Sequence, residues 1–287
     1  MERLIEIETP IGKFNVWTKG IGNNAKIKLL LLHGGPGGTH ELFECFENFL
    51  PKEGIEIYYY NQLDSFLSDQ PNDHSLWTVE RFVDEIEQVR KALDLTKENF
   101  FLFGHSWGGI VAIEYALLYH NNLKGLIISN MMSSCHDYAR YLENQNPKYM
   151  ELLVPNFYCK FFCHLQPWPE VVDRALSHLN TDIYNLLQGP SEFSITGTLA
   201  SWDRKEDLVK IKVPTLIIGA TYDTMNPEYL QWMASQLENS SSVICPNGSH
   251  CAMWDDQLYY FSKLIEFIKN VANQKEDAEN LDNNLFV

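Results

Sequence analysis

A serine between glycines is the first feature of this sequence that could carry chemistry. Ser106 lies in GHSWG at 104–108, a G-x-S-x-G pattern between the apolar run Phe100–Phe103 and the apolar stretch Ile110–Tyr119. Where such a pattern joins a strand to a helix, the serine occupies a sharp turn and its hydroxyl projects above the sheet. The helix that begins there also favours negative charge near its N-terminus. We therefore predict a nucleophilic Ser106 rather than an incidental serine in a glycine-rich turn.

A hydroxyl nucleophile needs a base that accepts its proton and an acid that orients the base. In the fold that carries this motif, the partners follow in the order serine, acid, histidine, and each comes after a late strand. Asp223 follows the strand-like run Thr215–Ile218, and His250 follows the run Ser241–Ile244. The spacing thus predicts a catalytic triad of Ser106, Asp223 and His250.

A second glycine-rich segment, HGGPGG at 33–38, follows the apolar run Ile27–Leu32. Loops of this kind bring backbone N–H groups close to a substrate. In acyl transfer, two such donors stabilise the oxygen that becomes negative in the transition state. We assign this oxyanion hole to the N–H groups of Gly35 and Trp107. A phosphate-binding loop would need a different glycine spacing, with a lysine or an acidic ribose ligand.

These residues require a scaffold of alternating strands and helices. Short apolar runs, bounded by glycine, proline or polar residues, are typical of buried strands. Segments with helical spacing separate them, most clearly from Val79 to Leu93. With an N-terminal antiparallel hairpin, the pattern predicts an α/β-hydrolase fold: a mostly parallel, eight-stranded sheet flanked by helices. The predicted strands are Leu4–Glu8, Phe14–Trp17, Ile27–Leu32, Ile55–Tyr60, Phe100–Phe103, Leu126–Ile128, Thr215–Ile218 and Ser241–Ile244.

The strand rhythm stops in the middle of the sequence, where aromatic residues, prolines and short helical stretches such as Glu170–Leu179 prevail. We predict a helical cap at 131–206, inserted between a first core part at 1–130 and a second at 207–272. A final amphipathic helix is expected near Leu258–Val271. The polar residues after it predict a flexible acidic tail at 273–287.

The composition and net charge of the chain limit the kinds of partner that it is expected to bind. Of 287 residues, 45% are hydrophobic, which is enough for a packed core, and the formal charge is −16. A uniformly acidic protein repels nucleic acid and anionic membranes, so neither is expected as a partner. The N-terminal MERLIEIETP has no apolar stretch of signal-peptide length, and no run approaches the length of a membrane span. We expect a cytoplasmic protein.

The six cysteines are few for this length and lie mostly among apolar neighbours. We interpret them as reduced, buried thiols. Cys159, Cys163 and His164 could suggest a metal site, but no matching second half is present in the sequence. Neither a metal nor an organic cofactor is expected.

The motifs together resemble those of the prolyl aminopeptidase (proline iminopeptidase) family of α/β-hydrolases. HGGPGG at 33–38, GHSWGG at 104–109, and the stretch from Tyr184 through GPSEF at 189–193 to Asp223 carry the resemblance, which covers about residues 1–270. It implies Ser106, Asp223 and His250 as the triad, and Glu192 as the carboxylate that holds the free amino terminus of a substrate. Tyr184 is expected to help orient that site.

Two departures from the family pattern are visible. A second amine-binding glutamate follows the catalytic aspartate in better-known members, whereas this sequence has Thr224. In the YDQLGSG-like turn of the family, Asn61 replaces the aspartate, and Asp64 and Phe66 replace glycines. One carboxylate is then expected to carry recognition of the amine alone, which leaves the affinity and the strictness of proline selectivity open, and the turn is expected to have a different shape.

The expected activity is that of a serine aminopeptidase, which releases N-terminal proline from small peptides through an acyl-enzyme. An esterase or amidase for uncharged acyl groups, with the same triad, is the alternative. A non-catalytic binding protein on a hydrolase scaffold is disfavoured by the complete triad. The oligomeric state is left open by the sequence.

Overall fold

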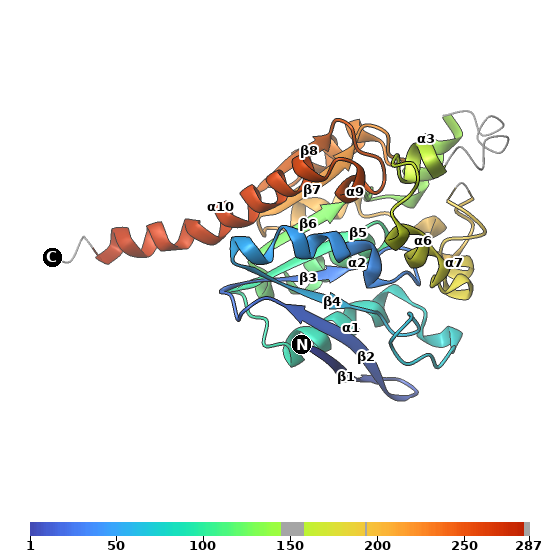
Figure 1. Cartoon of the computed structure of the whole chain (residues 1–287), viewed down its shortest axis with the longest axis horizontal. Helices are drawn as coiled ribbons and strands as arrows, with labels where there is room; N and C mark the ends of the chain where they lie inside the picture. The colour runs from blue at the N-terminus through green and yellow to red at the C-terminus, as the bar shows by residue number, and fades with distance from the viewer. Residues whose placement is uncertain (145–157, 193, 284–287) are drawn as a thin grey trace.

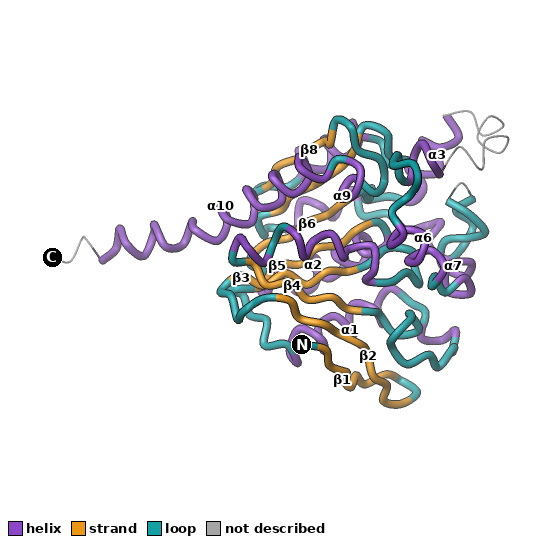
Figure 2. The backbone as a smooth tube through the Cα atoms, in the orientation of Figure 1, coloured by secondary structure: helices purple, strands orange, loops and turns teal. Residues whose placement is uncertain are grey.

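The computed structural model describes residues 1–144, 158–192 and 194–283, except for the side chains of 274–283. Its centre is an eight-stranded sheet with the order β1-β2-β4-β3-β5-β6-β7-β8. β1 and β2 form an antiparallel hairpin, β2 pairs antiparallel with β4, and the remaining neighbours pair in parallel. The predicted fold class is confirmed. Figure 2 shows the strands side by side through the middle of the molecule, with helices on both sides of the sheet.

The strands are β1 (Glu2–Thr9), β2 (Gly12–Ile21), β3 (Ile27–Leu32), β4 (Ile55–Tyr60), β5 (Phe100–His105), β6 (Gly125–Ser129), β7 (Thr215–Ala220) and β8 (Ser240–Cys245). The longer helical segments are η1 (His40–Asn48), α1 (Val79–Ala92), α2 (Trp107–Tyr119), α3 (Cys135–Asn144), α6 (Glu170–Ser177), α7 (Thr181–Leu187), α8 (Pro227–Gln236), α9 (Ala252–Asp255) and α10 (Gln257–Asn283). Short turns of helix are η2 (Pro51–Glu53), η3 (His74–Leu76), η4 (His120–Asn122), η5 (Tyr158–Phe162), η6 (Thr198–Ser201) and η7 (Lys205–Lys210).

Two apolar layers hold the sheet. Alternate residues of a strand point to opposite faces, so Leu30 and Leu102 pack with α1, α2 and α8, whereas Leu31 and Phe103 pack with η1, α9 and α10. Every residue of β5 and β7 is buried, which explains their continuous apolar runs. The centre of the sheet is therefore a rigid platform for the loops at its carboxyl edge.

The segments between β6 and β7 gather at one end of the molecule. Figure 1 shows α3, α6 and α7 together there, at the opposite end from the projecting helix α10. These helices lie within the predicted cap, of which residues 145–157 and Phe193 are outside the described residues. No helix among the described residues has both the length and the apolar character needed to cross a bilayer.

The last helix is longer than predicted. α10 continues to Asn283, past the expected end near Val271 and through most of the predicted tail. Gln, Lys, Glu and Ala are good helix formers, so the segment can extend an existing helix without burying an apolar face. The flexibility of the tail stays a prediction.

The turn after β4 keeps a glycine-like backbone without glycine. Asp64 and Phe66, the residues that replace family glycines, have positive φ angles of 65° and 39°. The carboxylate of Asp64 accepts hydrogen bonds from the Trp77 indole (2.9 Å) and the Asn72 N–H (2.8 Å). These contacts offset the strain of a left-handed conformation. Both residues thus adopt a left-handed conformation that glycine takes more easily, and the expected difference in the shape of the turn stays a prediction.

Candidate active site

Ser106 lies where β5 ends and α2 begins. Its φ and ψ are 55° and −126°, a conformation that costs free energy for any residue with a side chain. A Cβ on Gly104 would lie 2.1 Å from the Gly108 carbonyl oxygen, and a Cβ on Gly108 would lie 2.2 Å from that of Leu32. Both positions therefore require glycine. The strand, turn and helix around Ser106 match the context that the motif demands.

Asp223 and His250 meet at the carboxyl edge of the sheet. Nδ1 of His250 lies 2.8 Å from Oδ1 of Asp223, and both side chains are buried. A carboxylate only accepts hydrogen bonds, so Nδ1 carries the proton and Nε2 is the acceptor. Burial by itself would lower the pKa of His250, but the charge of Asp223 and its hydrogen bond outweigh burial and raise it.

Asn130 supports the acid. Its side-chain Nδ2 donates a 2.7 Å hydrogen bond to Oδ2 of Asp223, the carboxylate oxygen that His250 does not use. Asn130 directly follows β6 and has a positive φ of 53°, which asparagine tolerates better than most residues. Both oxygens of the acid are thereby fixed.

Ser106 and His250 line the same cavity, which has a volume of about 280 Å³. In the described part of the chain, the Ser106 hydroxyl makes no hydrogen bond with the imidazole. Catalytic hydrogen bonds are often long before substrate binds and shorten in the complex. The loop of His250 is held by the cap, since its N–H donates to the Phe161 carbonyl over 2.8 Å. The cavity walls come from the HGGPGG loop, η1 and the segment between β6 and β7, and their apolar members include Leu42, Phe162, Ala175, Leu176, Leu179 and Pro190.

The HGGPGG loop lies over the serine. A Cβ on Gly34 would be 3.0 Å from the Ser106 Cβ, so the two backbones are in close contact. Gly35 and Trp107, assigned to the oxyanion hole, border a second small cavity together with Ser106. Gln62 connects the HGGPGG loop to the start of α2. Its side-chain Oε1 accepts a hydrogen bond from the Trp107 indole (2.9 Å), and its backbone N–H donates to Nε2 of His33 (3.1 Å).

Glu192 borders both cavities, as does Ser106. Oε1 of Glu192 accepts a 2.6 Å hydrogen bond from the Tyr184 hydroxyl, and Oε2 lies 3.2 Å from the Tyr138 hydroxyl. Burial, together with the negative charge of Glu192, raises the pKa of Tyr184, so this phenol stays protonated and donates. A carboxylate positioned by tyrosines thus borders the same cavities as Ser106.

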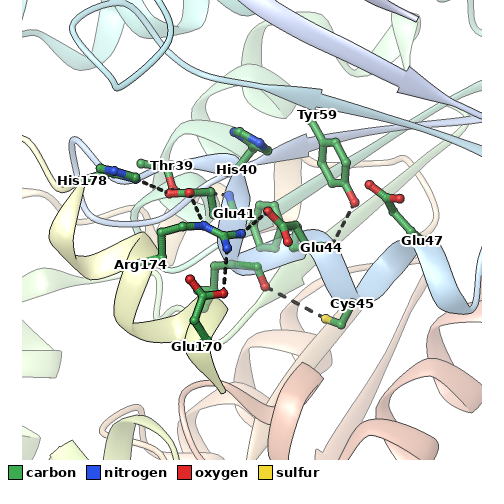
Figure 3. Close-up of polar contacts among 12 residues, drawn as sticks. Thr39, His40, Glu41, Glu44, Cys45, Glu47, Tyr59, Glu170, Arg174 and His178 are labelled. Carbon is green, nitrogen blue, oxygen red and sulfur yellow. Dashed lines mark hydrogen bonds and ion pairs between the residues drawn. The ribbon is translucent and has the colours of Figure 1, made fainter. Parts of the chain in front are cut away.

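A cluster of charged residues joins the cap to the core next to the cavity. Figure 3 shows Arg174 of α6 reaching between Glu41 and Glu44 of η1, with His178 beside Glu41. The Arg174 guanidinium lies 2.7 Å from Glu41 and 2.6 Å from Glu44, and Nδ1 of His178 lies 2.8 Å from Glu41. The His178 ring also stacks on Phe66, with 4.0 Å between centroids. Phe66, where the family has glycine, thus contributes to this attachment.

Sequence reasoning missed Asn130 and Tyr138. Asn130 had a signal, because it follows a predicted strand at the edge where the triad residues gather. Tyr138 had none, since a tyrosine on an amphipathic helix is usually a core residue. Its contact with Glu192 joins positions 54 residues apart.

Comparisons with known proteins bear on the fold of the chain. A model of the alpha/beta hydrolase fold family matches residues 28–158. The crystal structure of proline iminopeptidase from Mycobacterium smegmatis superposes with a TM-score of 0.85 at 22% identity, over 96% of this chain and 100% of that one. The chain is an α/β hydrolase.

Curated relatives define the family more narrowly. A proline iminopeptidase from Flavobacterium johnsoniae is 50% identical, over 95% of this chain and 99% of the relative. One from Elizabethkingia meningoseptica is 49% identical, over 93% of this chain and 98% of the relative. The chain belongs to the proline iminopeptidase family and is an enzyme of that type.

Proposed function

We propose that this enzyme is a serine aminopeptidase that releases N-terminal proline from small peptides through an acyl-enzyme intermediate. The observation that carries the proposal is the shared cavity of Ser106 and Glu192, a nucleophile and a carboxylate in about 280 Å³. An exopeptidase must recognise a charged amine next to the scissile bond. A partly buried carboxylate does so by a charge-assisted hydrogen bond.

In this mechanism the Ser106 hydroxyl attacks the prolyl carbonyl carbon while Nε2 of His250 takes its proton. Asp223 keeps the imidazole in the required tautomer and stabilises its charged form. The N–H groups of Gly35 and Trp107 stabilise the oxyanion, and loss of one such donor typically costs about a hundred- to a thousandfold in rate. His250 then protonates the leaving amine. Water, deprotonated by His250, hydrolyses the ester and releases free proline.

The carboxylate of Glu192 would pair with the secondary ammonium of proline. Tyr184 supports this role, since its hydroxyl donates to Oε1 at 2.6 Å and so holds the carboxylate in place for the cation. An internal peptide bond carries no cation, so its binding would partly desolvate the carboxylate of Glu192 without supplying an opposite charge, which is costly. Selection for a free terminus follows from that difference.

We further propose that the enzyme acts in the cytoplasm on short peptides. The cysteines of the chain are free, as expected in a reducing compartment. Residues of α6 and α7 line the cavity, which favours a short peptide over a folded protein.

A chromogenic prolyl amide and its N-acetylated form test the activity. The two share the scissile bond and differ in the ammonium, so the enzyme should hydrolyse the free form and spare the acetylated one. The Ser106→Ala variant is the control for contaminating peptidases. Equal hydrolysis of both substrates would contradict recognition through Glu192 and favour an esterase or amidase.

A further inference from the structure

Thr224 stands where the family pattern has a second glutamate, and it is buried next to the triad. The Thr224 hydroxyl donates a 3.2 Å hydrogen bond to Oδ1 of Asp223. The same oxygen accepts from Nδ1 of His250 at 2.8 Å. Thr224 is therefore a direct neighbour of the catalytic acid, not a spare position in the substrate cavity.

Tyr138 continues this path into the cap. It comes from α3 and is 2% exposed. Its hydroxyl lies 3.3 Å from Oγ1 of Thr224 and 3.2 Å from Oε2 of Glu192. An unbroken series of hydrogen-bonding contacts thus runs from Glu192 through Tyr138, Thr224 and Asp223 to His250.

The number of available protons determines which group donates and which accepts at each contact of this series. Asp223 accepts only, so the single proton of Thr224 goes to Asp223, and its oxygen can accept from Tyr138. Burial of Tyr138 raises the pKa of its hydroxyl, with the charge of Glu192 adding to the effect, so the phenol keeps its proton. That one proton has three acceptor atoms within reach: Oε2 and, more distantly, the backbone carbonyl of Glu192, and Oγ1 of Thr224.

We propose that Tyr138 and Thr224 are positioning residues that couple the amine-binding carboxylate to the triad, and that this neutral pair replaces the second glutamate of the family. The inference rests on the proposed function. An ammonium on Glu192 competes for the lone pairs of Oε2 and turns the Tyr138 proton towards Thr224. Thr224 then donates more strongly to Asp223, because hydrogen bonds in series polarise one another. Amine binding therefore raises turnover as well as affinity.

Steady-state kinetics of variants with the prolyl amide test this coupling. Thr224→Val keeps the shape and removes the hydroxyl, so kcat should fall about three- to tenfold with KM nearly unchanged. Thr224→Ser keeps the hydroxyl and should remain close to the unmodified enzyme. Tyr138→Phe removes a donor from Glu192 as well, so KM should rise and kcat should fall. The double variant should lose less than the product of the single losses, because both act on one series of contacts.

Folding is checked for each variant by circular dichroism and thermal unfolding, and Thr224→Ala replaces Thr224→Val if the latter does not fold. Unchanged kcat in both Tyr138→Phe and Thr224→Val would overturn the inference. A Thr224→Ser enzyme that is as impaired as Thr224→Val would also overturn it. The same holds if the loss in the double variant equals the product of the two single losses. If the unmodified enzyme hydrolyses free and N-acetylated prolyl amides equally, the proposed function itself fails.

Discussion

The hydroxyl of Tyr184 lies 2.6 Å from Oε1 of Glu192, eight positions further along the chain. Tyr184 belongs to α7, and Glu192 lies in the turn that follows it. The hydrogen bond holds the carboxylate at the border of the cavity that also contains Ser106. A carboxylate held in this way can bind a cation without first losing much side-chain entropy.

Replacing the carboxylate should remove recognition of the free amine. We expect Glu192→Gln to raise KM for the prolyl amide by about 10- to 100-fold, which corresponds to the loss of one hydrogen bond between charged groups. Hydrolysis of the N-acetylated amide should not fall. Glu206→Gln, at an exposed glutamate of η7, is the matched control and should behave as the unmodified enzyme. An unchanged KM in Glu192→Gln would rule out this role.

The acidic side of the pH profile should report His250. A base must be neutral to accept a proton, and Asp223 raises the pKa of His250 above its usual 6.5 despite burial. Activity should therefore decline as the pH falls through a midpoint above 6.5. The rate of inactivation by a fluorophosphonate measures this midpoint without a titrating substrate amine. In Asp223→Asn the midpoint should move to lower pH, whereas Asp207→Asn should leave it in place; a midpoint below 6.5 in the unmodified enzyme would contradict the pairing.

Asn130 should matter for turnover more than for affinity. Asn130→Ala removes the 2.7 Å hydrogen bond to Oδ2 of Asp223 and leaves that oxygen free to rotate away from the imidazole. We expect kcat to fall about tenfold, the cost of one hydrogen bond to a charged group. KM for the prolyl amide should change little. Equal kcat values for the variant and the unmodified enzyme would show that His250 and Thr224 are enough to orient the acid.

The attachment of the cap to the core should affect both stability and KM. Arg174→Met removes the guanidinium that pairs with Glu41, whose side chain is only 4% exposed. We expect a loss of about 1–3 kcal/mol, below the cost of breaking a fully buried pair because Arg174 itself is partly exposed. KM should rise, since α6 lines the cavity. Glu170→Gln is the control, because Glu170 is 74% exposed and its ion pair with Arg174 should be worth little.

Acid should reduce the stability difference between Arg174→Met and the unmodified enzyme. Burial by itself would raise the pKa of Glu41, but hydrogen bonds from His178, Arg174 and Thr39 outweigh it and lower the pKa. The resulting stabilisation is present above the unfolded-state value of about 4.3 and is lost as the pH falls through the lower folded-state pKa. Urea unfolding at pH 7 and at acidic pH measures the difference. If the difference in unfolding free energy between the two proteins is larger in acid than at pH 7, the stabilisation does not come from the lowered pKa of Glu41.

Sequence reasoning was most successful where physical signals are local. Buried parallel strands appear as apolar runs, so the eight strands and their alternation with helices could be predicted. Strand ends could not, because Gly104 and His105 continue β5 without an apolar signal. The extension of α10 was missed for a related reason, since a polar sequence of good helix formers cannot be distinguished from a polar tail by its composition.

The site residues likewise divide into those that have a signal in the sequence and those that do not. The order of Ser106, Asp223 and His250 along the chain predicts their roles because one fold repeatedly uses it. Asn130 and Tyr138 contact partners 93 and 54 residues away. The place of Asn130 after a predicted strand is a weak signal for its contact, whereas nothing near Tyr138 in the sequence indicates its own. Positive φ at Asp64 and Phe66 was also missed, since side-chain contacts compensate there for the loss of glycine.

The central claim is that Ser106 is the nucleophile activated by His250. The most direct measurement treats the purified enzyme with a fluorophosphonate and maps the modified peptide by mass spectrometry, with His250→Ala in parallel. We predict one adduct per chain, on Ser106, with complete loss of prolyl amide hydrolysis, and labelling that is at least a thousandfold slower in His250→Ala. An adduct on another residue, or full activity after Ser106 is modified, would contradict the account.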